Sequence, residues 1–192
     1  MDDFLRPIGQ ETLSDFFGLV QRHSFELKRR DGTWQRQVRE TYDRGDGAAV
    51  LICDAAAKSV ILVRQFRYPA YYRGENPYVI EVCAGKLEGD DPETCVRKEA
   101  LEETGRKLGH VEKVFDSFMS PGSVTERLTL FHGWVDENAR LLPGGGLDHE
   151  GEDIEVLNLH FAKALDMVET GEIADAKTIM LLQHAALRGL FT

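Results

Sequence analysis

Three glutamates, Glu99, Glu102 and Glu103, are spaced so that a helix would place them on one face. Residues at i, i+3 and i+4 of an α-helix lie within an arc of about 100°. Like charges at this spacing destabilise a helix by about 0.2–0.5 kcal/mol for each pair, so the arrangement favours a bound cation. Carboxylate oxygens are the ligands that Mg²⁺ prefers in proteins. The spacing therefore predicts a helix that binds a divalent metal ion.

The residues around these glutamates supply a start and an end for that helix. Asp91 can cap the first turn, and Pro92 suits the first helical position. Gly105 is a typical residue for the end of a helix. An apolar strand over residues 78–82 leads into a loop at Gly85. A strand, a glycine loop and a capped helix are thus predicted in succession.

The rest of the chain predicts more strands than helices. Asp31-Gly32 lies between two strand-like runs and indicates a hairpin. Two helices are expected near the C-terminus, over 161–170 and 174–190, and they are separated by Gly171. This order predicts an α/β fold with a mixed sheet, preceded by a separate β element in the first 45 residues. The further predicted strands are 16–27, 33–42, 48–53, 59–63, 111–117, 127–135 and 155–159.

Composition narrows the class of protein. A chain of 192 residues with 42% hydrophobic content can bury a sizeable core. A net charge of −10 argues against nucleic-acid and membrane partners, which select basic patches. No apolar run approaches the roughly 18 residues of a membrane span, and no signal peptide is evident. Cys53, Cys83 and Cys95 lack metal-type spacing, which favours reduced thiols and a cytoplasmic location.

The stretch over residues 84–105 resembles the Nudix box, G-x5-E-x7-R-E-U-x-E-E-x-G-U, in which U is aliphatic. Three positions depart from the pattern. The loop after the glycine is one residue short, which puts Asp90 in the acidic position, and Lys98 and Arg106 replace the expected arginine and aliphatic residue. The resemblance to the Nudix hydrolase family implies an α/β/α sandwich with a mixed sheet. A solvated acidic helix is the plainer alternative, but it does not explain the aligned strand, glycine and cap.

Further segments resemble the bacterial GDP-mannose pyrophosphatase branch of that family, and the ADP-ribose pyrophosphatase branch shares much of the layout. The resemblance implies hydrolysis of a nucleotide sugar by a homodimer. Residues 1–45 would form a small antiparallel β domain for dimerisation, residues 46–192 the Nudix hydrolase domain, and the two subunits would partly share the site. The segments that carry this resemblance are 39–45, 63–67, 119–126, 144–146, 152–157, 170–173 and Lys177.

The same resemblance implies a metal site for Mg²⁺, with Mn²⁺ as an alternative. Glu99, Glu103, Glu152 and the backbone carbonyl of Ala84 would be ligands. Glu102 would hold a second ion or orient water. The acidic loop over 144–153 is expected to be mobile, and Glu150 in it would be the catalytic base. The competing interpretation is a surface loop whose acids have no role.

Substrate contacts are also implied by the resemblance. Arg67 would pair with a phosphate, and Phe17 would stack on the base. Taken singly, such charged residues are more often surface ion pairs, and a phenylalanine is equally often part of a core. The full set of expected substrate contacts is Phe17, Arg39, Glu40, Arg67, Gly85, Glu126 and Lys177.

Three functions therefore remain open from the sequence. The first is hydrolysis of GDP-mannose to GMP and mannose 1-phosphate. The second is hydrolysis of ADP-ribose to AMP and ribose 5-phosphate. The third is a catalytically silent Nudix domain that binds a nucleotide sugar, although none of the expected metal-binding glutamates is missing.

Overall fold

The computed structural model describes residues 3–147 and 151–191. The chain forms two compact units. The first consists of Met1–Asp46 with Phe118–Arg127, and the second of Gly47–Ser117 with Leu128–Thr192. The short segment 118–127 therefore belongs to the same unit as the first 46 residues, although it is far from them in the sequence.

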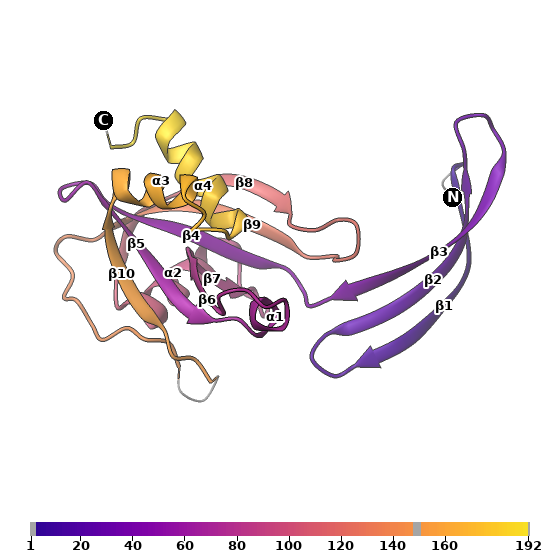
Figure 1. Cartoon of the computed structure of the whole chain (residues 1–192), viewed down its shortest axis with the longest axis horizontal. Coiled ribbons are helices and arrows are strands. Elements are labelled where there is room, and N and C mark those ends of the chain that lie inside the picture. The colour runs from indigo at the N-terminus through magenta and orange to yellow at the C-terminus, as the bar shows by residue number, and fades with distance from the viewer. Residues whose placement is uncertain (1–2, 148–150, 192) are drawn as a thin grey trace. The chain divides into compact units, whose positions relative to one another are not determined.

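The first unit is built on a three-stranded antiparallel sheet (Figure 1). Its strands, in spatial order, are β1 (Leu5–Asp15), β2 (Leu19–Lys28) and β3 (Trp34–Asp43). The predicted hairpin between β2 and β3 is confirmed. The Thr33 N–H donates to Asp31 Oδ1 at 2.9 Å, and Gly32 takes a positive φ of 86°, which glycine adopts without strain.

Strand β1 was not predicted. It contains Pro7 and Gly9, which disfavour strands, and it lacks apolar alternation. The strand is stabilised by its antiparallel pairing with β2. The register of this pairing shifts between Pro7 and Gly9 and again between Thr12 and Ser14. Long-range pairing has therefore overridden local propensity.

In the described residues of the second unit, the chain forms a seven-stranded mixed sheet and four helices. The sheet order is β10-β5-β4-β9-β8, while β6 pairs with β5 and β7 pairs with β4. Strand β4 is parallel to β9 but antiparallel to β5 and β7. The strands are β4 (Gly47–Asp54), β5 (Ser59–Phe66), β6 (Tyr78–Glu81), β7 (Cys83–Lys86), β8 (Leu108–Phe118), β9 (Arg127–Val135) and β10 (Glu155–His160). The helices are α1 (Tyr68–Tyr72), α2 (Pro92–Thr104), α3 (Phe161–Glu169) and α4 (Ala176–Leu187).

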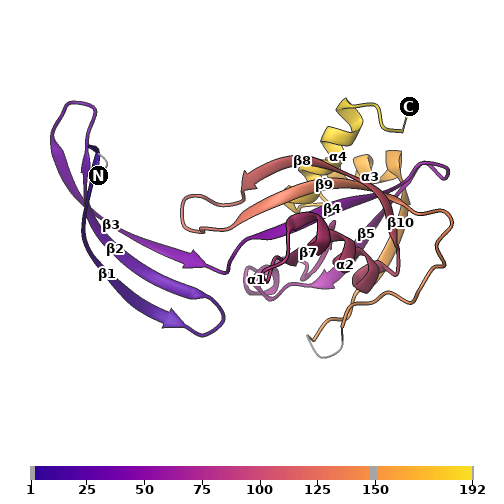
Figure 2. The ribbon, with the colours of Figure 1, turned by 180° about the vertical axis from the view of Figure 1, so that it is seen from behind.

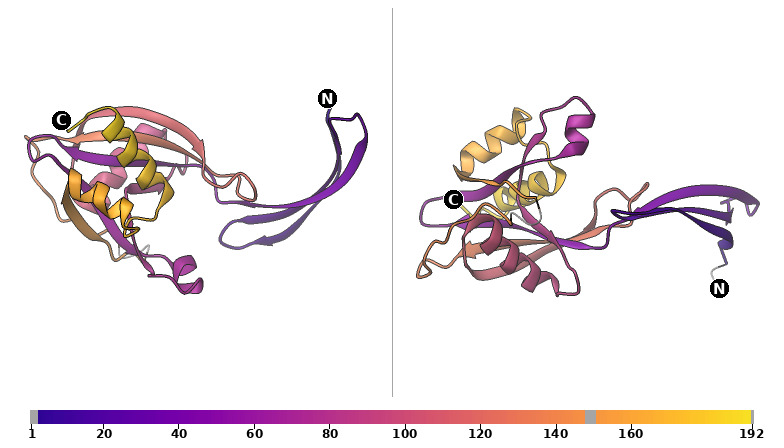
Figure 3. Two further views of the ribbon diagram at one scale, coloured as in Figure 1. Left: turned by 45° about the horizontal axis from the view of Figure 1, so that its top comes forward. Right: turned by 90° about the horizontal axis from the view of Figure 1, so that it is seen from below.

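Helices cover both faces of this sheet, as the predicted α/β/α sandwich requires. Helix α2 lies on one face (Figure 2), and α3 and α4 lie on the other (Figure 3). Alternate residues of a strand point to opposite faces. Ala48, Val50 and Ile52 of β4 accordingly share a buried cluster with Val96 and Ala100 of α2. The central strands are therefore apolar on both sides, which explains their continuous hydrophobic sequence.

Two local expectations are corrected. Gly85 belongs to strand β7 and pairs with Ala48, whereas the sequence predicted a loop there. Helix α1 was not predicted, because it is only five residues long and carries Pro69 near its start. In the described part of the chain, no helix is long and apolar enough to cross a membrane.

Candidate active site

Helix α2 carries the three glutamates, and its ends are formed as the sequence predicts. The Asp91 side chain accepts hydrogen bonds from the backbone N–H groups of Glu93 and Thr94, both at 3.1 Å. Gly105 ends the helix with a φ of 67°. With both ends capped, the helix presents Glu99 and Glu103 at fixed positions beside β7.

Gly85 provides the space that Glu99 occupies. A Cβ atom built on Gly85 would overlap the Glu99 carboxylate. The φ of Gly85 is not positive, so the backbone there would accept another residue. Glycine is therefore required for the close approach of Glu99 and not for a turn.

Glu103 is a carboxylate in the protein interior. Its residue is 1% exposed, and its Oε2 atom has no hydrogen-bond partner among the described residues. Burial, together with the charges of Glu99 and Glu152, raises its pKa to about 8, against opposing hydrogen bonds from Cys83 and Ala84. A buried, unpaired carboxylate oxygen is costly unless a cation or proton satisfies it.

The acidic loop reaches this position by docking on the end of α2. The backbone N–H of Gly145 donates to the carbonyl of Glu103 at 2.8 Å, and that of Gly146 donates to the carbonyl of Glu102 at 3.2 Å. These bonds satisfy carbonyls that a helix end otherwise leaves unpaired. The Glu152 carboxylate then accepts the Leu147 N–H at 3.0 Å. Glu150 lies outside the described residues.

The donor set suits a hard divalent cation. Glu99, Glu103 and Glu152 interact electrostatically, Glu103 has an unsatisfied oxygen, and carboxylates are the preferred ligands of Mg²⁺. Within the described ranges, no three His, Cys, Asp or Glu side chains lie close enough together to hold a metal ion as they stand. A bound ion would therefore have to draw the carboxylates closer together.

Glu102 and Ala84 occupy different surroundings. Glu102 is half-buried, and its charge is the largest influence that raises the pKa of Lys98, four residues earlier on the helix. Ala84 pairs with Ala49 across β7 and β4. The roles of Glu102 and of the Ala84 carbonyl stay predictions.

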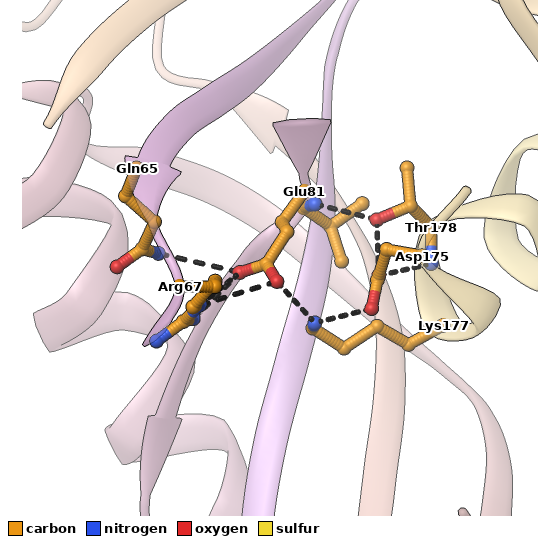
Figure 4. Close-up of polar contacts among 7 residues, drawn as sticks. Gln65, Arg67, Glu81, Asp175, Lys177 and Thr178 are labelled. Carbon is orange, nitrogen blue, oxygen red and sulfur yellow. Dashed lines mark hydrogen bonds and ion pairs between the residues drawn. The ribbon is translucent and has the colours of Figure 1, made fainter. Parts of the chain in front are cut away.

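A second cluster joins two of the predicted substrate residues through one carboxylate (Figure 4). Arg67 Nη2 lies 2.6 Å from Glu81 Oε2, and Arg67 Nε lies 3.1 Å from the same oxygen. Lys177 Nζ lies 3.6 Å from Glu81 Oε1. Burial lowers the pKa of Arg67, but the hydrogen bonds and charge of Glu81, with the charges of Glu103 and Asp175, leave it raised.

Glu81 was not among the residues that the sequence singled out. It ends the apolar strand β6 and its side chain is 7% exposed. A lone acid inside an apolar run just before the glutamate motif is the signal that would have found it, because a buried charge requires a partner. The identity of that partner depends on tertiary contacts.

The remaining predicted residues belong to the first unit. Arg39 and Glu40 are neighbours on β3, so their side chains point to opposite faces of that sheet. Glu40 accepts hydrogen bonds from Arg22 at 3.0 and 3.2 Å. Phe17 is 70% exposed, with the Arg44 guanidinium 4.9 Å from its ring centre. Glu126 lies in the segment that joins this unit and is half-buried.

Comparison with known proteins identifies the class. The protein-family model described as NUDIX domain matches residues 43–182 of the sequence. A second family model, described as GDP-mannose pyrophosphatase NudK N-terminal domain, matches residues 5–42. The chain belongs to the Nudix family and is a Nudix hydrolase. Members of this family generally use divalent metal ions.

Curated relatives define the branch. A GDP-mannose pyrophosphatase of Pectobacterium atrosepticum is 51% identical over 96% of this chain and 95% of its own length. That of Escherichia coli O157:H7 is 46% identical over 95% of each chain. A solved structure titled "Crystal structure of ADP compounds hydrolase" has a TM-score of 0.74 over 97% of this chain and 96% of its own. At 17% identity, that likeness shows the fold.

The buried carboxylate gives a prediction for the metal-free protein. Because folding raises the pKa of Glu103 from 4.5 to about 8, the folded state holds more protons than the unfolded state between these values. Stability should therefore fall as pH rises through this range. Glu103→Gln removes the titrating group, so it should stabilise the metal-free protein at pH 8.5 by several kcal/mol more than at pH 4.5.

Denaturant unfolding in the presence of a chelator measures this difference. Glu93→Gln is the control, since Glu93 lies on the same helix but is exposed and paired with Arg97. Equal effects of Glu103→Gln at both pH values would contradict the buried, protonated state.

Proposed function

We propose that this enzyme hydrolyses GDP-mannose to GMP and mannose 1-phosphate with Mg²⁺ as cofactor, or with Mn²⁺ in its place. The observation that carries the proposal is the identity of 46–51% to GDP-mannose pyrophosphatases over nearly the whole chain. A set of carboxylates with an unsatisfied buried oxygen supports the metal dependence. Nucleotide sugars carry a diphosphate, which suits a site that combines metal-binding acids with Arg67.

In the proposed reaction, the residues of the second unit bind the metal, bind the phosphates or accept a proton. Glu99, Glu103, Glu152 and the Ala84 carbonyl would hold the metal, with Glu102 beside them. A metal ion held there would supply positive charge against the diphosphate and would lower the pKa of a water molecule. Arg67 and Lys177 bind phosphate oxygens. Glu150, or alternatively Glu152, takes the proton of the attacking water.

ADP-ribose is the second candidate substrate. The solved structure titled as an ADP compounds hydrolase shares the fold, but its 17% identity carries no argument about the base. The identity to GDP-mannose pyrophosphatases therefore favours guanine. Catalytic silence is disfavoured because the chain is a Nudix hydrolase that keeps Glu99, Glu102 and Glu103.

We also propose that the enzyme is a cytoplasmic homodimer joined through its first unit. None of the residues described in that unit is buried. A three-stranded sheet without a core of its own is marginally stable, and association is a common remedy. A groove of about 710 Å³ on its surface, lined in part by Leu5, Pro7, Ile8 and Phe25, offers apolar area for a second copy. The three buried free cysteines are compatible with a reducing compartment.

Product analysis tests the proposed reaction. GDP-mannose should yield GMP and mannose 1-phosphate, and the activity should disappear when Mg²⁺ is chelated and return when it is restored. ADP-ribose in the same assay should give a lower kcat/KM. Faster turnover of ADP-ribose would overturn the substrate assignment, and full activity without any divalent ion would overturn the metal assignment.

Gly85→Ala tests the metal ligands. The new methyl group overlaps the end of the Glu99 side chain, which can swing away, so the fold should survive while Glu99 leaves its position. We expect the Mg²⁺ concentration for half-maximal activity to rise about 10-fold or more. Gly109→Ala is the control, because a Cβ there meets only ordinary contacts at 3.7 Å and beyond. Unchanged Mg²⁺ dependence in Gly85→Ala would remove Glu99 from the ligand set.

Sedimentation velocity tests the homodimer. The wild-type protein should sediment at twice the 21.6 kDa of one chain. Ile8→Asp places a charge in the groove and should weaken the dimer, whereas Val38→Asp is the matched control. The two residues are 51% and 47% exposed, and Val38 does not line the groove. A monomeric wild-type protein, or a dimer that only Val38→Asp disrupts, would contradict the proposed interface.

A further inference from the structure

We infer that Glu81 is a positioning residue that holds Arg67 and Lys177 as one preformed cationic pair for the diphosphate of the substrate. The inference rests on the proposed function and adds a residue to it. Glu81 touches both cations with a single carboxylate, while Gln65 Nε2 lies 3.4 Å from its Oε2 atom. Figure 4 shows the Glu81 carboxylate between the two cationic side chains.

The orientation of Arg67 leaves a binding edge available. Glu81 engages the Nε and Nη2 side of the guanidinium. Among the described residues, Arg67 Nη1 makes no hydrogen bond, and the side chain is 42% exposed. A guanidinium held along one edge can still offer the edge formed by Nη1 and Nη2 to two oxygens of a phosphate. Glu81 therefore determines which edge faces a ligand.

Lys177 connects this carboxylate to helix α4. Its Nζ atom lies 2.9 Å from Asp175 Oδ1, and its side chain is 11% exposed. Asp175 also accepts hydrogen bonds from the backbone N–H and the hydroxyl of Thr178, at 3.0 and 2.6 Å. The Val82 N–H, next in sequence to Glu81, donates to the Thr178 hydroxyl at 2.8 Å. The start of α4 and the end of β6 are thus held together.

The charges in the cluster balance before any ligand binds. Glu81 and Asp175 oppose Arg67 and Lys177, so the cations need no large rearrangement to remain in place. Buried ion pairs often stabilise a fold less than apolar residues would. A role in orienting two cations accounts for the burial of Glu81 better than stability does. The influence of Glu103 on the pKa of Arg67 indicates that the cluster is near the metal-binding acids.

Glu81→Gln tests the inference because it keeps the shape and removes the charge. Arg67 and Lys177 should lose their common orientation, so KM for GDP-mannose should rise about 10- to 100-fold. The kcat value should stay within about threefold, because the metal-binding acids are unchanged. GDP binding to the metal-free protein, measured by calorimetry, should weaken in parallel.

A mutant cycle separates positioning from other roles. If Glu81 acts through the two cations, Glu81→Gln should change kcat/KM less than about twofold when Arg67→Ala and Lys177→Ala are already present. An equal loss in both backgrounds would overturn the inference, because Glu81 would then act independently of the cations. An unchanged KM in the single variant would overturn it as well.

Controls keep the result interpretable. Glu155→Gln breaks the ion pair of Arg64 and Glu155, 2.8 Å apart on the same sheet, and should leave KM unchanged. If Glu81→Gln alone does not fold, the cycle is measured in the Arg67→Gln background, because removal of Glu81 then leaves one cation fewer without a partner. Turnover of GDP-mannose by the wild type tests the proposed function separately. If ADP-ribose is hydrolysed instead, the same ratios are measured with it.

Discussion

The central constraint is the burial of carboxylates in the second unit. Glu103 is almost completely buried, and Glu99 and Glu152 add their charges to its surroundings. Without compensation, such a group takes up a proton or destabilises the fold. Among the described residues, the largest influences on the pKa of the Glu103 carboxylate include hydrogen bonds from Cys83 and Ala84 but no positively charged side chain. A divalent ion would satisfy such a carboxylate, in agreement with the divalent metal ions that Nudix hydrolases generally use.

Three backbone features bring the carboxylates together. The missing Cβ of Gly85 lets α2 place Glu99 against β7. The cap at Gly105 ends the helix at Thr104, the residue after Glu103. The backbone N–H groups of Gly145 and Gly146 donate to carbonyls in the last turn of the helix. The same loop contains Glu152, which accepts a hydrogen bond from the Leu147 N–H. Each feature uses the small size or conformational freedom of glycine at a point where a backbone or carboxylate approaches closely.

A cationic cluster complements this acidic one within the same unit. Its members come from the end of β5, the end of β6 and the start of α4, so the sheet and the helix that covers it both contribute. Glu81 belongs to the cationic cluster through its contacts, although its charge is negative. Electrostatic influence of Glu103 on Arg67 links the two clusters. A diphosphate and a metal ion have opposite charges, and the paired clusters suit both.

The sequence alone determined the chemistry-bearing helix, because its caps and its i, i+3, i+4 spacing are local properties. The order of the predicted strands and helices also indicated an α/β fold with a mixed sheet, whereas the α/β/α sandwich was implied by the resemblance to the Nudix family. Strand β1 depended on long-range pairing, which local propensity does not encode. The place of Gly85 in β7 and the role of Glu81 likewise depended on which elements pack together. Tertiary structure decided them because a close approach or an ion pair is formed between residues that are distant in the chain.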